Sequence, residues 1–419
     1  MTVPWQVVAP LDAEVYAHVR RRTIFDCCKW DPQVEDVATL ASFPIVLDEA
    51  DWAALRMAAV ALYHETLAAE AEVLATPSLH RHLGLPGCIR TVLGRAARVG
   101  AARAFARLMR FDFHLTTDGW RVSEVNSDVP GGFIEASGFT RLVAAHYPGL
   151  ASAGDPADAL AEAVRAAVGP DAFVALVHAT AYTDDRQVMV YLAGRLAARG
   201  VRPMLTSPAD LRWVGGHARL ADGPLTTSVD AIVRFYPAEW LPNLPRSCGW
   251  SNFFAGGCTP QCNPATALLS QSKRVPLVWD KLRTDMPVWR RMLPETRSPR
   301  LAERGWNGHW VLKPALGRVG DSIGISGVTP PKEWRRITRH ASWHPGYWIA
   351  QRRFVAVPLP TTRGPTYPCV GVFVMDGRVT GAYGRIATRP LINELAQDAA
   401  VLIHANGHTP SEKLVLHDA

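Results

Sequence analysis

The sequence predicts an α+β protein of several lobes, with mixed and antiparallel sheets and a helical N-terminal region. Three observations predict this fold class. Apolar residues in the first hundred positions recur at helical spacing. Residues 109–126 alternate apolar and polar about a short turn, and residues 370–375 and 378–383 flank Asp376-Gly377, so both stretches are expected to form β-hairpins. Residues 172–206 follow the pattern strand, helix, strand, which indicates a βαβ-like unit.

The elements can be assigned in order along the 419 residues. Helical spacing and capping residues such as Asp48 predict helices over 11–22, 48–74, 86–99, 156–168, 186–199 and 265–279. Alternating or continuous apolar runs predict strands over 109–116, 120–126, 172–178, 203–206, 231–236, 310–313, 348–355, 370–375 and 378–383.

A loop rich in Gly, Cys and Pro, residues 247–265, is the best internal boundary. We therefore expect one unit over 1–404, with lobes 1–145, 146–262 and 263–404, and a C-terminal tail over 405–419.

Composition excludes several classes of protein. With 48% hydrophobic and 20% charged residues the chain is typical of soluble globular proteins. It has no secretory signal pattern and no run of about 18 apolar residues, so we expect a cytoplasmic protein with no membrane partner. The net charge of +7 indicates anionic partners, but the basic residues are scattered, which favours nucleotide or carboxylate ligands over nucleic acid.

The seven cysteines have no framework spacing, and we expect free thiols. Cys258 and Cys262, with Cys248 nearby, leave half a zinc site as the weaker alternative.

The hairpin over 109–126 carries the first candidate site. A three-residue loop, 117–119, would place Asp112 opposite Glu124 and Arg110 opposite Asn126, all on one face. The other face would be buried, and it holds Met109, Phe111, Phe113, Leu115 and Val125.

Opposed carboxylates repel each other unless something neutralises them, and a hard divalent cation bound by carboxylate and amide oxygens is the simplest neutraliser. The alternative is an ordinary hairpin with a solvated polar face. The segment after the hairpin favours a ligand site, because Asp128, Pro130 and two glycines form a tight turn before Glu135 begins a helix.

The candidate phosphate-binding segment does not match the common phosphate-binding motifs. The sequence contains neither a P-loop motif nor a G-x-G-x-x-G motif. Lys313 instead ends a predicted strand and precedes a glycine turn, 314–320, whose amides and Arg318 could cover phosphates; the alternative is a plain hairpin loop. Only six of the 45 basic residues are lysine, so Lys273 and Lys313 are also notable for not being arginine. Two lysines together with a metal-binding carboxylate pair are typical of a site that binds the phosphates of ATP.

The ordered motifs resemble the glutathionylspermidine synthetase-like branch of the ATP-grasp ligases. The resemblance covers about residues 22–390, and its motifs are FDCCKWDPQV (25–34), RFDFHL with DGWRVSEVNSDVPGGFIEA (110–136), FYPAEW (235–240), SQSKRVPLVW (270–279), KPALGRVG (313–320), QRRFV with PLP (351–360) and GAYGR (381–385). It implies a multi-lobed ATP-grasp fold.

The resemblance also implies cofactors, which are ATP and Mg²⁺, two ions being expected. The metal ligands would be Asp112, Glu124 and Asn126. The ATP-binding residues would be Lys273, Lys313, Gln351, Gly317 and Gly320.

In the same way the resemblance implies catalytic and substrate-binding residues. Arg318 would stabilise the phosphoryl group in transfer, and Arg110 and Arg385 would hold the acid substrate or its acyl phosphate. Glu239 is a candidate for orienting the amine, with a helix-start charge as the alternative.

Three positions depart from the family pattern. Asn263 stands where glutamate is usual, Val129 and glycines replace Thr and Ser after Asp128, and no Arg-Glu pair follows Gly384. In the family these positions lie near the acid and the amine, so the resemblance does not imply glutathione or spermidine as substrates.

We therefore expect a ligase that activates a small acid, such as an amino acid or short peptide, with ATP and joins it to an amine. The alternatives are a small-molecule phosphotransferase at the same Mg-ATP site and a non-catalytic nucleotide-binding regulator. A basic nucleic-acid binder is the third alternative, and a steep salt dependence of binding would favour it.

Overall fold

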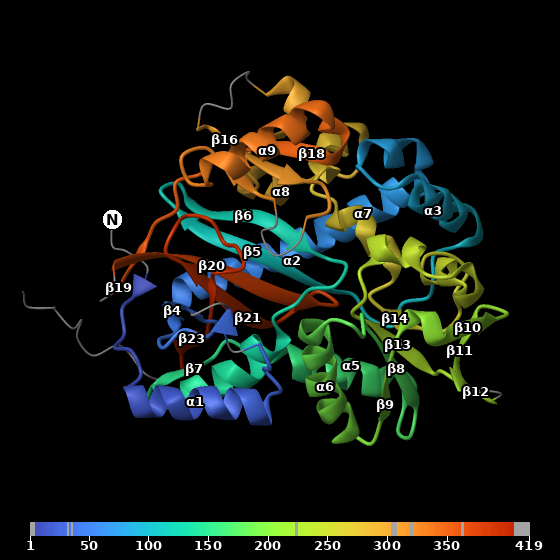
Figure 1. The fold of residues 1–419 in the computed structure, drawn as a ribbon, viewed down its shortest axis with the longest axis horizontal. Helices are drawn as coiled ribbons and strands as arrows, with labels where there is room; N and C mark the ends of the chain where they lie inside the picture. The colour runs from blue at the N-terminus through green and yellow to red at the C-terminus, as the bar shows by residue number, and fades with distance from the viewer. Residues whose placement is uncertain are drawn as a thin grey trace, which may run out of the picture.

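The computed structural model describes residues 5–31, 33–34, 37–222, 225–302, 308–317, 322–361 and 364–405. These residues surround a central antiparallel sheet of six strands in the order β22-β21-β20-β5-β6, with β19 paired to β20 (Figure 1). The strands are β5 (Leu108–Thr116), β6 (Gly119–Asn126), β19 (Leu359–Thr361), β20 (Gly364–Met375), β21 (Arg378–Ala387) and β22 (Gln397–Ala399).

Both predicted hairpins belong to this sheet. β5 pairs with β6 and also with β20, so Asp112 lies opposite Glu124 on one side and Gly371 on the other. A Cβ atom on Gly371 would lie 2.7 Å from the Arg110 Cδ and 2.9 Å from the Asp112 Oδ1, so only glycine leaves room for these side chains. The arrangement of Arg110 and Asp112 therefore depends on β20, a strand more than 200 residues later in the chain.

Helix α2 (Glu49–Ala75) covers one face of the sheet. Asp48 caps it as predicted, since its side chain accepts a hydrogen bond from the Asp51 amide. The apolar face of α2 packs on the predicted buried face of the hairpin, where Met109, Phe111 and Phe113 are fully buried. The polar face of β5 is left on the opposite side of the sheet. Helices α1 (Ala13–Asp26) and α3 (Gly87–Val99) lie near their predicted positions.

A parallel sheet forms the second lobe, in the order β14-β13-β8-β9. Its strands are β8 (Phe173–Val177), β9 (Arg202–Thr206), β13 (Ala231–Arg234) and β14 (Gln261–Cys262), with helices α5 (Pro156–Val168) and α6 (Thr183–Ala197). The predicted βαβ unit is β8-α6-β9, and α5 has its predicted bounds. An antiparallel ribbon follows β9, formed by β10 (Leu211–Val214), β11 (His217–Asp222) and β12 (Leu225–Ser228).

A third antiparallel sheet has the order β15-β18-β16-β17 and carries helix α9 (Pro331–Trp343). Its strands are β15 (Thr296–Arg297), β16 (Trp310–Pro314), β17 (Gly324–Ile325) and β18 (Trp348–Arg352), and helix α8 (Pro287–Met292) precedes them. β18 ends at Arg352, three residues before the predicted end of that strand.

Two small sheets complete the architecture. The first has the order β1-β4-β23-β7 and the second pairs β2 with β3. The strands are β1 (Trp5–Gln6), β2 (Gln33–Val34), β3 (Val37–Ala38), β4 (Ile45–Leu47), β7 (Leu150–Ser152) and β23 (Val401–His404). No helix in the described ranges combines the length and the apolar character that a membrane crossing requires.

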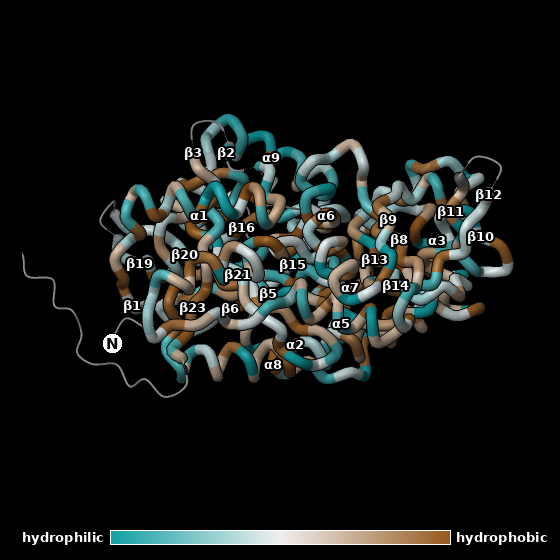
Figure 2. The backbone as a smooth tube through the Cα atoms, turned by 90° about the horizontal axis from the view of Figure 1, so that it is seen from below, coloured by the Kyte–Doolittle hydropathy of each residue, from teal (hydrophilic) through white to brown (hydrophobic). Residues whose placement is uncertain are grey.

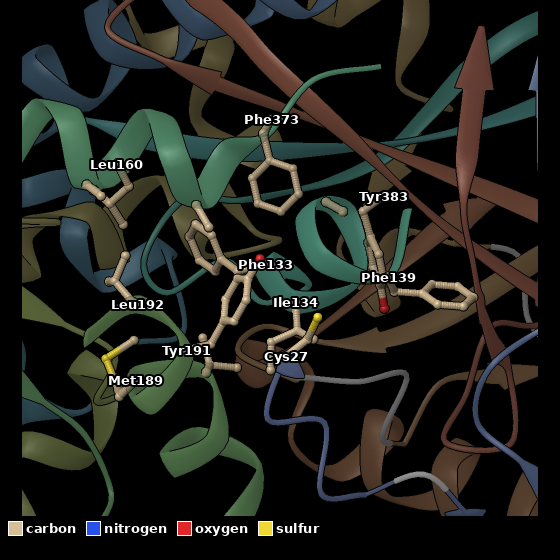
Figure 3. Close-up of a cluster of buried hydrophobic side chains, with 14 of the residues drawn as sticks. Cys27, Phe133, Ile134, Phe139, Leu160, Met189, Tyr191, Leu192, Phe373 and Tyr383 are labelled. Carbon is tan, nitrogen blue, oxygen red and sulfur yellow. The ribbon is translucent and has the colours of Figure 1, made fainter. Parts of the chain in front are cut away.

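The main core lies on the face of the central sheet away from α2. Figure 3 shows Phe133, Ile134 and Phe139, from the helical segment after the hairpin, packed near Phe373 and Tyr383 of the second hairpin. That segment is a π-helical turn (Glu135–Phe139) that continues into α4 (Thr140–Ala144). In Figure 2 many of the hydrophobic residues lie in strands, whereas α9 is largely hydrophilic.

The predicted helix over 265–279 is wrong. The segment forms a 3₁₀ turn (Ala265–Ala267), the short helix α7 (Leu268–Gln271) and a second 3₁₀ turn (Val275–Lys281). Tertiary hydrogen bonds break it, because the Ser272 hydroxyl donates to the Leu83 carbonyl at 2.6 Å and the Lys273 amide donates to the Ala315 carbonyl at 2.9 Å. Pro276 also lacks the amide that a continuous helix needs.

Candidate active site

The structure confirms the two predicted pairs on the polar face of the hairpin but not the predicted turn. Asp112 lies opposite Glu124, and Arg110 lies opposite Asn126. The turn has two residues rather than three, since Thr116 pairs with Gly119, and the register shifts beside Asp112. Ser123 is therefore an extra residue in β6, a β-bulge that restores the predicted pairs.

Three hydrogen bonds hold the Asp112 carboxylate in place. The Arg110 guanidinium donates from Nε to Oδ1 at 2.7 Å and from Nη2 to Oδ2 at 2.9 Å. The Asn126 amide donates to Oδ2 at 3.0 Å. Burial lowers the pKa of Arg110, but Asp112 more than offsets this and raises it above the ordinary value. The Asp112 carboxylate is thus held in a fixed position beside Glu124.

Two lysines from the C-terminal part of the chain approach the other carboxylate. The Lys273 ammonium lies 3.1 Å from Glu124 and also donates to the Gly317 carbonyl at 2.8 Å. Lys313 donates to the carbonyl of Ser123, the bulged residue, at 3.2 Å. Burial raises the pKa of Glu124, yet the two ammonium groups outweigh it and hold that pKa at about 2. Burial, with the charge of Lys273, lowers the pKa of Lys313 to about 8.

One cavity of about 800 Å³ unites most of the predicted site residues. Those that line it are Arg110, Asp112, Glu124, Asn126, Glu239, Lys313, Gly317, Gln351 and Arg385. Lys273 lines a small apolar pocket of about 50 Å³ that shares Glu124 and Gln351 with the cavity. Arg318 and Gly320 lie outside the described residues, so their predicted roles stay predictions.

The donor set at the hairpin fits Mg²⁺ by its chemistry. Mg²⁺ prefers oxygen ligands, and Asp112 and Glu124 present carboxylate oxygens from opposed strand positions to one cavity. Glu124 stays ionised at any physiological pH because its pKa is about 2. Bound Mg²⁺ would neutralise phosphate charge next to Lys313.

The predicted substrate-binding residues Arg385 and Glu239 both line the cavity. Arg385 donates to the Asn393 carbonyl at 2.7 Å and lies 3.8 Å from the Asp398 carboxylate. Glu239 lines the same cavity beside Trp240, whose ring stacks near that of Tyr182 at 5.7 Å.

Asn263, one of the departures from the family pattern, is a framework residue in this protein. Its side chain accepts from the Leu108 amide and donates to the carbonyls of Leu108, Ser127 and Asp128. It is 3% exposed and fastens the start of β5 to the turn after β6.

Sequence reasoning assigned no role to several residues that line the cavity. His114 is one of them, and burial together with Lys313 lowers its pKa to about 4, so its imidazole is neutral at pH 7. The others form an ion-pair cluster around Lys29, which contains Asp31, Glu135 and Asp398. The scarcity of lysine was the available signal for Lys29, whereas two of its partners, Glu135 and Asp398, are distant in sequence.

Comparisons with known proteins agree with this architecture. A glutathione synthetase-like effector from Globodera pallida has a similar fold, with a TM-score of 0.62 and 13% identity over 93% of this chain and 97% of that chain. A candidate gamma-glutamylcysteine synthetase from Methylobacillus flagellatus KT shares 14% identity over 78% of this chain and 88% of that chain, with a TM-score of 0.41. Because the TM-score of the second protein is too low to indicate a shared fold, only the first likeness informs the fold.

A search of curated proteins finds no match. The family described as glutathionylspermidine synthase preATP-grasp matches residues 35–403. This match and the first structural likeness confirm the predicted α+β fold of the ATP-grasp type and the resemblance stated from the motifs. The chain belongs to the glutathionylspermidine synthase preATP-grasp family.

Proposed function

We propose that the protein is an ATP-dependent carboxylate–amine ligase that forms an amide bond through an acyl phosphate and releases ADP and phosphate. One observation carries the proposal: a single cavity is lined both by Lys313 with two opposed carboxylates and by an acidic cluster around Lys29. Arg110 connects the two groups, because it donates to Asp112 and lies over the ring of Tyr383, whose hydroxyl donates to Asp398. Phosphate charge requires cations, whereas an amine that arrives as an ammonium requires anions. Membership of the family supports the same reaction class.

In this proposal Lys273 and Lys313 bind ATP phosphates, and Gln351 lies beside the nucleotide. Asp112, Glu124 and Asn126 hold Mg²⁺, whose charge favours transfer of the terminal phosphoryl group to the acid. Arg110 and Arg385 hold the acid, Glu239 orients the amine, and Arg318 stabilises the phosphoryl group in transfer.

The test is a panel assay for release of ADP and phosphate from Mg-ATP. The acids are amino acids and di- and tripeptides including glutathione, and the amines are ammonia, ethanolamine, putrescine and spermidine, each acid being tried with and without each amine. ADP release that needs both substrates, with a product lighter than their sum by one water, supports the ligase. A stable phosphorylated product from one substrate alone would instead establish a phosphotransferase, and ATP binding without turnover would favour a regulator.

Lys313 gives ATP binding an expected pH dependence. Its pKa of about 8 in the free protein means that it is charged at pH 7 and loses its charge as the pH rises through 8. Loss of a charge-assisted hydrogen bond to phosphate costs about 1.5 kcal/mol, so we expect ATP affinity to fall about tenfold between pH 7 and pH 9.5. Calorimetric titration with Mg-ATP across this range measures the effect.

The matched control is Lys313→Arg, because arginine keeps its charge throughout this range. We expect its ATP affinity to change little with pH. An equal decline in both proteins would show that another group titrates.

A further inference from the structure

The acidic cluster in the cavity is organised around one buried lysine. The Lys29 ammonium lies 2.5 Å from Glu135, 3.2 Å from Asp31 and 3.2 Å from Asp398. Its side chain is 5% exposed, and all four residues line the cavity. These three carboxylates face two cations, the Lys29 ammonium and, 3.8 Å from Asp398, the Arg385 guanidinium. One negative charge is left in excess, which suits a cationic ligand.

Glu135 differs from the other two carboxylates in its hydrogen bonds. Asp31 accepts a second bond from Gln187 at 2.6 Å, and Asp398 accepts one from the Tyr383 hydroxyl at 2.8 Å. Glu135 is 6% exposed, and its Oε1 accepts from Lys29, but its Oε2 is buried and accepts no hydrogen bond from the described residues. A buried carboxylate oxygen is costly to leave without a donor, so this atom points to a donor on a ligand.

A continuous set of contacts connects Glu135 to the residue predicted to hold the acid. Arg110 donates to the Gly131 carbonyl at 2.6 Å, and its guanidinium lies over the Tyr383 ring at 5.0 Å. Gly132 packs so closely that a Cβ atom there would lie 3.0 Å from the Tyr383 ring. The turn at Gly131 and Gly132 thus lies along the wall that Arg110 and Tyr383 form, and Glu135 lies three residues further on, in the helical segment that follows.

The chemistry of amide formation requires a proton acceptor at such a place. An aliphatic amine is an ammonium at neutral pH and has no lone pair until it loses a proton. Burial raises the pKa of Glu135 above that of a free glutamate, and Asp398 adds to this effect although Lys29 opposes it. A carboxylate of raised pKa accepts a proton more readily than an ordinary one.

We propose that Glu135 is a catalytic residue that binds the ammonium group of the amine substrate through Oε2 and accepts the proton it loses before attack. This proposal rests on the proposed ligase function. In the step, the R–NH₃⁺ proton passes to the Glu135 carboxylate, and the nitrogen lone pair forms the C–N bond at the acyl carbon. The bond from that carbon to the phosphate oxygen breaks, phosphate leaves with the electron pair, and the second nitrogen proton goes to the departing phosphate.

The test compares two nucleophiles in Glu135→Gln, a substitution that keeps the size of the side chain and an acceptor for Lys29. The first nucleophile is the panel amine with the highest wild-type turnover, and the second is hydroxylamine, which is largely uncharged at neutral pH and needs no proton acceptor. We expect amide formation to fall about 100-fold or more, the usual contribution of general base catalysis. We expect hydroxamate formation, and the ADP release that accompanies it, to stay within about threefold of wild type.

Hydroxamate formation also controls for folding, because only an intact ATP and acid site makes it. Glu162→Gln, at a carboxylate on α5 whose side chain is 69% exposed, is the matched control and should change neither product. Equal losses of amide and hydroxamate in Glu135→Gln would overturn the proposal and make Glu135 a structural residue, and unchanged amide formation would also overturn it. If the wild-type protein makes neither product from any acid, the ligase function itself fails.

Discussion

Glu124→Gln is expected to lower the kcat of Mg-ATP-dependent turnover by about 10³-fold or more, and Asp112→Asn should do the same. Each substitution keeps the shape of the side chain and removes one of the two opposed charges that we assign to metal binding. Glu124 also neutralises Lys273, at 3.1 Å, so its loss should loosen the phosphate-binding lysines. Initial rates over a range of Mg²⁺ concentrations measure the effect, and the concentration for half-maximal turnover should rise.

The unfolding midpoint in urea separates this effect from loss of the fold. The Glu124 side chain is 25% exposed, so we expect Glu124→Gln to unfold close to wild type. Asp112→Asn removes the counter-charge of the buried Arg110 guanidinium and should lose some stability, so its turnover is measured where the urea curve shows it to be folded. Unchanged turnover in either variant, under conditions where wild type needs Mg²⁺, would show that the metal site lies elsewhere.

The hairpin illustrates what local sequence determines. The alternation from Met109 to Leu115 fixes which face is buried, because a shift of one residue would expose every large apolar side chain. The length of the turn was harder to predict. A two-residue turn with a bulge at Ser123 and a three-residue turn without a bulge both place Asp112 opposite Glu124. Burial of Val122 favours the bulged form, in which this side chain faces the core.

The cavity illustrates what local sequence cannot determine. The break at Ser272 depends on hydrogen bonds to Leu83 and Ala315, both distant in the chain. Lys29 contacts Glu135 and Asp398, which are 106 or more residues away in the chain, so no local sequence pattern could predict the cluster. Motif order revealed the individual members of the site, while the pairing of β5 with β20 and the ion pairs assembled them.

The second large expected effect is on stability, at the buried pair of Asp128 and Arg234. Both side chains are 0% exposed; the guanidinium donates to the Asp128 Oδ1 at 2.5 Å and also to the carbonyls of Asn263 and Tyr236. The second Asp128 oxygen accepts from the Ala238 amide at 2.9 Å. Asp128→Asn leaves the Arg234 charge buried without its counter-charge, so we expect it to lower the free energy of unfolding by about 3–5 kcal/mol.

Urea unfolding of Asp128→Asn, Arg234→Met and the double variant measures this effect. The double variant should lose less than the sum of the two single losses, because neither single variant retains a compensated charge. Asp280→Asn is the matched control, since the pair of Asp280 and Arg290 has a similar distance, 2.8 Å, but side chains 89% and 46% exposed. Exposed pairs contribute about 0–1 kcal/mol, so this variant should unfold near wild type. Similar losses from Asp128→Asn and Asp280→Asn would mean that burial of the pair is not what stabilises the junction between the turn after β6 and β13.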